Sequence, residues 1–275
     1  MTEPDGSFEN GPLAPAIELR GIAVEYSRGS RVIADLTTQI DEGSFVAIVG
    51  PNGCGKSTLL RAVAKLLPPA AGSVILHGRD VRERSARELA RELGMLPQSN
   101  TAPEGMRVVD LIARGRFPHR APFARWSATD EGAVAAAMRA TAVTDLASRD
   151  VDALSGGQRQ RVWLAMVLAQ DTPVLLLDEP TTFLDIAHQI DMMELFRRVN
   201  REQDRTIVAV LHDLGHAARY ADRIIAMREG RIVLDGAPAD ILTAESVEAV
   251  FDLPCRVFPD PDTGTPLVLP RPRST

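Results

Sequence analysis

A glycine-rich segment between two apolar stretches constrains the fold of this 275-residue chain more than any other feature. The segment GPNGCGKS runs from Gly50 to Ser57 with the spacing G-x4-G-K-S. It follows the apolar run FVAIV at 45–49 and precedes residues 59–67, whose Leu and Val side chains share one helical face. A strand, a glycine-rich turn and an amphipathic helix in this order predict a phosphate-binding loop in a parallel α/β sheet.

The loop predicts a nucleotide site with a defined role for each residue. Small residues let backbone N–H groups and the helix N-terminus face phosphate oxygens. We expect Lys56 to reach the β- and γ-phosphates of ATP and Ser57 to offer an oxygen to Mg²⁺, whereas Cys54 only has to be small. The expected ATP-binding residues of this segment are Gly50, Pro51, Asn52, Gly53, Cys54, Gly55, Lys56, Ser57 and Thr58.

Two acidic residues end a second apolar strand, in the segment VLLLDE that starts at Val174. Ligands of open α/β sheets bind beyond the carboxyl ends of the strands, where these acids stand. We expect Asp178 to hold Mg²⁺ and Glu179 to accept a proton from the water that attacks the γ-phosphate. An Asp-Glu pair is common on protein surfaces, so it is a weak signal alone. It indicates a catalytic site only together with the phosphate loop.

The sequence LSGGQ, from Leu154 to Gln158, stands at the start of a predicted helix. It is the signature of the ATP-binding-cassette (ABC) family, and its place between the phosphate loop and LLLDEP follows the order of that family. The chain resembles ABC ATPases over residues 17–253. The resemblance implies an α/β P-loop NTPase cassette with a RecA-like core sheet, an antiparallel β subdomain and a helical subdomain.

The resemblance also assigns roles to four single residues. Tyr26 corresponds to the aromatic side chain that stacks on adenine, and Gln98 in MLPQ to the Q-loop, which binds ATP and serves Mg²⁺. Asp185 in TTFLD corresponds to the D-loop, and His212 in VLHD to the switch histidine at the γ-phosphate, a catalytic role beside that of Glu179. Each residue has an ordinary alternative: Tyr26 could be a strand aromatic, Gln98 and Asp185 loop polar groups, and His212 could mimic a metal pair with the histidine four positions later, although no third ligand is nearby.

Two copies of the chain are expected to act together. The sequence contains one phosphate loop and one signature, and in the family the signature of one subunit covers the ATP held by the other. Two complete sites therefore require a two-fold pair, with ATP favouring the closed pair and hydrolysis releasing it. The residues expected to contact the partner's ATP are Ser155, Gly156, Gly157 and Gln158.

The chain divides into a short leader, one ABC domain and a tail. Residues 1–15 predict a disordered leader, 16–253 the ATP-binding domain, and 254–275 a Pro-rich tail that wraps the surface. Several local patterns subdivide the domain. They are the alternating strands at 17–26 and 32–40, a solvated helix at 79–93, the helical insert at about 100–170 with a capping box at Ser127, a helix at 185–199 through Ile186, and a hairpin formed by 224–227 and 231–234.

Composition narrows the class of protein further. Asp and Glu outnumber Lys and Arg by 37 to 31, which argues against generic nucleic-acid binding. Two cysteines 201 positions apart support neither a disulfide framework nor a zinc site. No apolar run approaches the roughly 18 residues needed to span a bilayer. The ABC resemblance implies a peripheral protein on the cytoplasmic face of the cell membrane, and these features of the composition are compatible with it.

The residues next to the motifs indicate which subtype of ABC ATPase the chain resembles. Gln98 and Ser155 are 57 positions apart, which leaves no room for the long coiled coils of DNA-repair ATPases. The segments LDEPTTFLDIAHQ and VLHDLGHAARYADRIIAMREG most closely resemble the ATPases of iron–siderophore importers, apart from Gly215, where Asn is common. That resemblance implies two integral-membrane permease subunits and, indirectly, a substrate-binding protein. A vitamin B12 or haem importer remains an alternative, as does a non-transport ABC switch or scaffold.

A basic stretch lies in the helical insert. No acidic residue stands between Asp110 and Asp130, whereas five basic residues do. Contact with permease helices or anionic headgroups and a merely solvated loop are both open interpretations. The basic residues are Arg114, Arg116, His119, Arg120 and Arg125.

Overall fold

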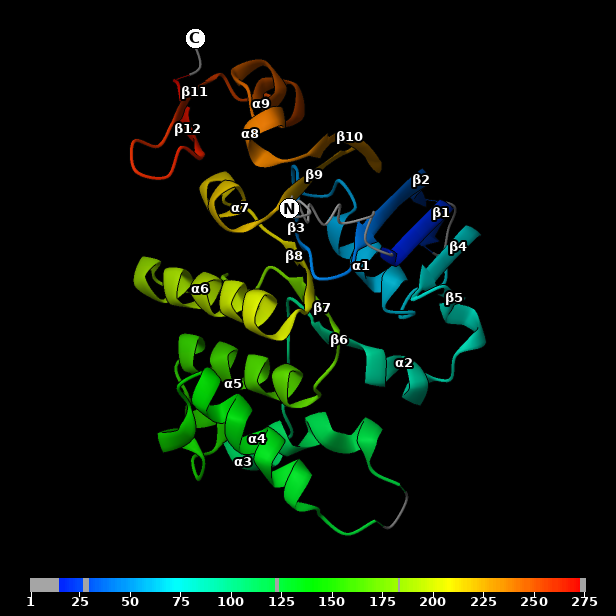
Figure 1. Ribbon diagram of the computed structural model, residues 1–275, viewed down its shortest axis with the longest axis vertical. Helices are drawn as coiled ribbons and strands as arrows, with labels where there is room; N and C mark the ends of the chain where they lie inside the picture. Colours follow the sequence, from blue (N-terminus) through cyan, green and yellow to red (C-terminus); the bar gives the residue numbers. More distant parts are fainter. Residues whose placement is uncertain (1–14, 27–29, 122–123, 183, 273–275) are drawn as a thin grey trace, which may run out of the picture.

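The computed structural model describes residues 15–26, 30–121, 124–182 and 184–272. Its centre is a six-stranded sheet in which five neighbouring strands are parallel and the edge strand β10 is antiparallel to β9 (Figure 1). In spatial order the strands are β10 (Arg231–Gly236), β9 (Arg223–Arg228), β3 (Phe45–Val49), β8 (Thr206–Val210), β7 (Val174–Asp178) and β6 (Leu93–Leu96).

Both faces of this sheet are buried. Along β3, Phe45, Ala47 and Val49 join one hydrophobic cluster, and Val46 and Ile48 join the other. The alternation follows from the period of two along a strand, and cover on both faces explains the unbroken apolar run. The first cluster includes residues of α6 (Ile186–Gln203) and α7 (Leu214–Tyr220), and the second includes residues of α1 (Lys56–Val63).

An antiparallel sheet packs on the α1 side. Its strands are β2 (Ser30–Asp41), β1 (Pro15–Tyr26), β4 (Ala71–Leu76) and β5 (Arg79–Asp80), in that spatial order. The pairing of β1 with β2 confirms the antiparallel strands expected at 17–26 and 32–40. Their alternating apolar residues share the second cluster with the core sheet, so this sheet covers one face of the cassette.

The helical insert lies at the opposite end of the molecule from residues 255–270 (Figure 1). Its elements are α3 (Val108–Ala113), η2 (Arg114–His119), α4 (Ala128–Ala140), η3 (Thr144–Leu146), η4 (Val151–Ala153) and α5 (Gly156–Ala169). The capping box predicted at Ser127 is present: its side chain accepts from the Asp130 N–H, and the Asp130 carboxylate accepts from the Ser127 N–H. This reciprocal bonding fixes where α4 begins.

Three local predictions need correction. Residues 79–93 form β5, η1 (Val81–Glu83) and α2 (Ala86–Glu92) rather than one solvated helix, because Asp80 and Ser85 each cap a separate helix. Ile186 is exposed and not on the buried face of α6, because it stands at the first turn, directly after the Asp185 cap. The expected tail at 254–275 contains a hairpin.

That hairpin follows α8 (Pro238–Ile241) and α9 (Ala244–Phe251) and pairs β11 (Cys255–Pro259) with β12 (Pro266–Pro270). Proline is tolerated because a two-stranded ribbon has free edges that need no N–H donor. Val257 and Val268 pack against the main hydrophobic cluster, which anchors the ribbon. The leader expected at 1–15 lies outside the described residues, except for Pro15.

Helices long and apolar enough to cross a bilayer do not occur in the described part of the chain.

Candidate nucleotide-binding site

The loop between β3 and α1 requires glycine at its first position. Gly50 has φ +146°, and a Cβ there would lie 2.1 Å from the carbonyl oxygen of Met227. Gly55 caps α1 with φ +108°, a conformation that residues with a side chain rarely adopt. The buried Cys54 packs under the loop, where burial raises the pKa of its thiol. The close packing at position 50 and the positive φ at positions 50 and 55 thus explain why both are glycine.

Lys56 is the first residue of α1 and is buried. Its Nζ donates to the carbonyl oxygens of Gly50 at 2.8 Å and Pro51 at 3.0 Å. The loop therefore wraps around a fixed ammonium group at the N-terminus of a helix, and both features attract anions.

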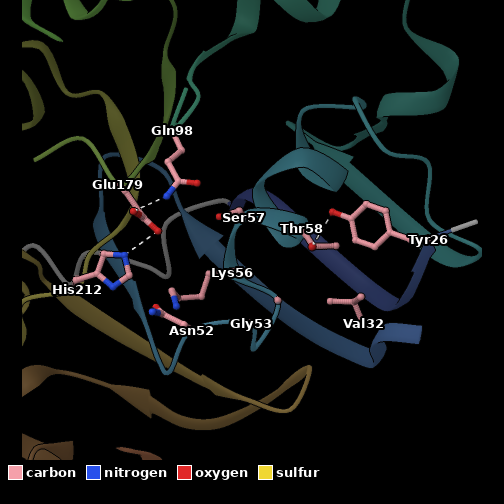
Figure 2. A pocket seen from close by; sticks show the side chains of 11 residues that line it. Tyr26, Val32, Asn52, Gly53, Lys56, Ser57, Thr58, Gln98, Glu179 and His212 are labelled. Carbon is pink, nitrogen blue, oxygen red and sulfur yellow. Dashed lines mark hydrogen bonds and ion pairs between the residues drawn. The ribbon is translucent and has the colours of Figure 1, made fainter. Parts of the chain in front are cut away.

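A cavity of about 490 Å³ opens beside this loop (Figure 2). Its walls come from the carboxyl ends of neighbouring strands of the core sheet, together with β1 and β2. Of the predicted ATP-binding residues, Gly50, Pro51 and Cys54 do not line it. The lining residues are Tyr26, Val32, Asn52, Gly53, Gly55, Lys56, Ser57, Thr58, Gln98, Glu179 and His212.

Tyr26 and Glu179 lie on opposite sides of this cavity (Figure 2). The Tyr26 hydroxyl lies 3.1 Å from Oγ1 of Thr58, which ties the ring to the first turn of α1. Its side chain is half-exposed, so a ring face is available to a planar ligand. Val32 also lines the cavity and was not predicted, because a Val in an alternating strand carries no sign of ligand contact.

Asp178 ends β7 and is fully buried, with 0% of its surface exposed. Oγ of Ser57 donates to its Oδ1 at 2.8 Å, whereas Oδ2 is buried without a hydrogen-bond partner among the described residues. Burial raises the pKa of Asp178, and the Ser57 hydrogen bond opposes it only in part. A carboxylate oxygen without a partner next to a hydroxyl is the kind of donor set that Mg²⁺ prefers, so these residues fit the metal.

Glu179 is held by three donors, two from other segments of the chain and one from the turn that follows it. Its Oε1 lies 2.7 Å from Nε2 of His212, and its Oε2 accepts from Nε2 of Gln98 at 2.7 Å and from Oγ1 of Thr182 at 3.2 Å. Burial acts to raise the pKa of Glu179, but the contacts with His212, Gln98 and Thr182 outweigh it, and the pKa lies below its ordinary value. The carboxylate is thus ionised and aimed at the cavity. Thr182 lacked any sequence signal for this role.

The signature residues lie elsewhere. Ser155 caps α5, where its Oγ accepts from the Gln158 N–H and Oε1 of Gln158 accepts from the Ser155 N–H. None of the residues 155–158 lines the cavity of the same chain. Asp185 is also outside it: its carboxylate caps α6 and lies 2.8 Å from Nδ1 of His188. The fold therefore keeps the signature apart from its own phosphate loop.

Three of the five basic residues in this stretch of the insert have partners within the chain. Arg116 is only 4% exposed, and its Nε donates to the buried Asp130 at 3.1 Å. His119 lies 2.7 Å from the Gln170 carbonyl, and the Arg120 guanidinium stacks over Trp126. The interpretations that treated Arg116 as available for contact are corrected, because its charge is neutralised inside the insert.

The metal pair considered for His212 also finds no support. In the ranges that the structure describes, no cluster of three or more His, Cys, Asp or Glu side chains could hold a metal ion. His216 instead belongs to α7, where its ring packs against Tyr220.

Comparison with known proteins agrees with this geometry. Residues 33–182 match the family described as ABC transporter. Ferric enterobactin transport ATP-binding protein FepC of Escherichia coli (strain K12) is 53% identical over 92% of this chain and 93% of its own length. Achromobactin transport ATP-binding protein CbrD of Dickeya dadantii (strain 3937) is 50% identical over 93% of this chain and 94% of its own.

Solved structures agree as well. A metal-chelate type ABC transporter in an inward-facing conformation superposes with a TM-score of 0.80 and 26% identity, covering 94% of this chain and 98% of that one. The predicted P-loop NTPase cassette fold is confirmed. The chain therefore belongs to the ABC transporter family, as one of its ATP-binding proteins.

Proposed function

We propose that this chain is the ATP-hydrolysing subunit that energises the import of ferric siderophores through a membrane permease. The observation that best supports ATP hydrolysis is the position of Glu179. Its ionised carboxylate is fixed by three donors at the cavity wall, one residue beyond the buried Asp178–Ser57 pair. A fixed carboxylate beside a phosphate loop suits the deprotonation of water at a phosphoryl group.

The residues of the cavity divide the work of hydrolysis. Lys56 neutralises the β- and γ-phosphates of ATP, and the N-terminus of α1 adds backbone donors. Asp178, Ser57 and Gln98 would hold Mg²⁺, which supplies charge neutralisation at the phosphate oxygens when bound. Glu179 takes the proton of the attacking water, and His212 orients Glu179 and contacts the γ-phosphate.

A second copy of the chain completes each site. The cavity lacks any cover over its open side from residues 155–158 of its own chain. We assign these residues to the partner's ATP, with Asp185 linking the two sites. Chemical change at one ATP then alters the affinity between the two copies, which is the mechanical output that a transporter needs.

The relatives suggest the cargo. FepC is named for ferric enterobactin transport and CbrD for achromobactin transport, and both align over more than nine-tenths of the chain. On this basis two copies act at the cytoplasmic face of the membrane on two integral-membrane permease subunits, and indirectly with a substrate-binding protein. No nucleic acid takes part.

Uptake of a radioactive ferric siderophore tests this proposal. Cells would carry the wild-type gene, Lys56→Ala or Lys65→Ala in place of the native gene. Lys65 is the only other lysine, and its Nζ also donates to two carbonyls, those of Arg82 and Arg84, far from the cavity. It is therefore a matched control.

We expect uptake to be lost in Lys56→Ala and retained in Lys65→Ala at equal protein levels. Undiminished uptake in Lys56→Ala would discard siderophore import. Cobalamin and haem uptake in the same strains would then be measured, and normal uptake of all three would favour a non-transport switch.

A further inference from the structure

The backbone at Glu179 adopts a conformation that its neighbours must hold. Glu179 has φ +53°, in the left-handed region that a residue with a Cβ adopts at a cost in free energy. Such a conformation persists only where the surrounding structure over-determines it. The contacts on the following residues therefore decide where the Glu179 carboxylate points.

Two hydrogen bonds fix the backbone around Glu179. The Thr182 N–H donates to the Glu179 carbonyl at 3.3 Å within the same turn. The other bond comes from outside the turn: Nε2 of Gln160 donates to the carbonyl of the buried Pro180 at 3.1 Å. Gln160 lies on α5 and does not line the nucleotide cavity, so it reaches Glu179 only through this carbonyl.

The same helix begins with the signature. Gly157, at the first turn of α5, lies so close to Leu184 that an added Cβ would be 3.2 Å from its Cδ2. Nε2 of Gln189 in turn donates to the Leu184 carbonyl at 3.1 Å. The first turns of α5 and the residues that follow Glu179 are therefore joined at two points, Gln160 with Pro180 and Gly157 with Leu184.

We propose that Gln160 is a positioning residue for hydrolysis, which holds the turn after Glu179 and connects it to the signature helix of the same subunit. This inference rests on the proposed function, because it assumes that the signature contacts the ATP of the partner subunit. It also assumes that Glu179 acts on the ATP bound by its own subunit. A displacement of α5 when the signature engages the partner would be passed through Gln160 to the Glu179 backbone. Each site would then sense whether the other is closed.

The test is ATP hydrolysis by three Gln160 variants of the full chain. Gln160→Ala removes the donor, Gln160→Glu keeps the shape but not the donor, and Gln160→Lys keeps an N–H donor of similar reach. We expect kcat to fall about 10- to 100-fold in Gln160→Ala and Gln160→Glu, as for a catalytic group displaced by a fraction of an ångström to one ångström. The Kd for ATP should stay within about twofold, because Gln160 does not touch the cavity. Gln160→Lys should recover most of the lost kcat.

A control at the other end of α5 separates positioning from general stability. Nε2 of Gln170 also donates to backbone carbonyls, those of Ala90 at 2.6 Å and Leu93 at 3.0 Å. Gln170→Ala should lower the melting temperature at least as much as Gln160→Ala while leaving kcat unchanged. Equal losses of kcat in both variants, or a kcat of Gln160→Ala within about twofold of wild type, would overturn the positioning role.

Communication between the two ATP sites of the pair is tested by the cooperativity of ATP hydrolysis. We expect the Hill coefficient for ATP to fall towards 1 in Gln160→Ala, and an unchanged Hill coefficient would overturn the link. Hydrolysis by the wild-type protein tests the proposed function separately. A wild type that hydrolyses ATP cooperatively while Gln160→Ala behaves identically would contradict only this inference.

Discussion

The phosphate-loop side of the molecule lines the nucleotide cavity, whereas residues 155–158 on the signature side do not. On the phosphate-loop side, Lys56, Asp178 and Glu179 are buried or held by hydrogen bonds around one cavity. On the signature side, Ser155 is exposed at a capped helix start and does not line the cavity of its own chain. The phosphate-loop side has a cavity for ATP without signature residues in its lining, and the signature side has an exposed helix start that is outside this cavity.

This difference is what the proposed pair of chains would resolve. A capped helix start with free amide groups is suited to an anion, and the phosphates in the cavity are the anion that the fold provides for. Residues 155–158 do not line the cavity of their own chain, so a second copy in the proposed two-fold arrangement would bring the two sides together. Substitutions on the two sides should therefore have different effects on ATP affinity and on turnover.

The largest expected effect is on turnover, in Glu179→Gln. The amide keeps the size of the side chain and can still contact His212 but cannot accept the proton of water. We expect kcat to fall about 10²- to 10⁴-fold, as for the loss of a general base, with ATP affinity preserved. Single-turnover hydrolysis and equilibrium ATP binding measure the two quantities. Unchanged turnover would contradict the role of Glu179.

The second effect concerns stability of the insert rather than the pocket. Asp130 caps α4 and pairs with the buried Arg116, so Asp130→Asn leaves a buried charge without its partner. We expect a loss of about 3 kcal/mol in the free energy of unfolding, measured by urea denaturation. ATP affinity should not change. Asp145→Asn, at an exposed position of η3, is the control and should change stability by less than about 0.5 kcal/mol.

The pH dependence of that loss follows from the pKa of Asp130. The Ser127 hydrogen bond, and then Arg116, hold this pKa below the ordinary value of 3.8, against the opposing effect of burial. Because the folded-state pKa is the lower one, the stabilisation is complete above pH 3.8 and is lost as the pH falls through the folded-state value. The difference between wild type and Asp130→Asn should therefore shrink in acid. A difference that grows in acid would contradict the pairing.

A smaller effect is expected from Ser155→Ala, which changes the signature side alone. The variant loses a helix cap, worth about 1 kcal/mol, and the hydroxyl offered to the partner's ATP. Thr243→Ala removes an equivalent capping box from α9, which is remote from the cavity. We expect about tenfold lower kcat only in Ser155→Ala, which corresponds to the lower end of the roughly 1.5–3 kcal/mol that a single hydrogen bond to a charged group is worth. Equal kcat in the two variants would argue against a role for Ser155 at the partner's site.

The smallest effect concerns the adenine end of the cavity. Tyr26→Ala removes the ring, and we expect ATP to bind about 5- to 10-fold more weakly, which corresponds to the lower end of the roughly 1–3 kcal/mol for stacking of a base on an aromatic ring. Tyr26→Phe keeps the ring and loses only the contact with Thr58, so its affinity should stay near wild type. A larger loss in Tyr26→Phe than in Tyr26→Ala would mean that the hydroxyl, not the ring, matters.

Most of the phosphate-loop side could be predicted because its chemistry is local in sequence. The strand, the glycine loop and the start of α1 are contiguous, and the cap at Ser127 is closed by a residue three positions later. Roles that depend on distant partners could not be predicted. The basic pattern around Arg116 gives no sign that Asp130 neutralises it, and the residues around Gln160 give no sign that its amide donates to the Pro180 carbonyl.

The C-terminal hairpin was missed for a related reason. Pro259, Pro266 and Pro270 argue against a strand inside a sheet, but β11 and β12 pair only with each other. The apolar residues that anchor the ribbon, Val257 and Val268, pack on a cluster built from residues far earlier in the chain. Only the folded core shows what these residues contact.

The most direct test of the composite site is the mass in solution of Glu179→Gln, measured by light scattering with and without ATP and Mg²⁺. We predict the mass of one chain without ATP and of two chains with it, because ATP binds but is not hydrolysed. Adding Ser155→Arg, which blocks the signature, should return the mass to one chain while ATP still binds. A mass of one chain for Glu179→Gln at saturating ATP would contradict the claim that the two sides meet across a pair.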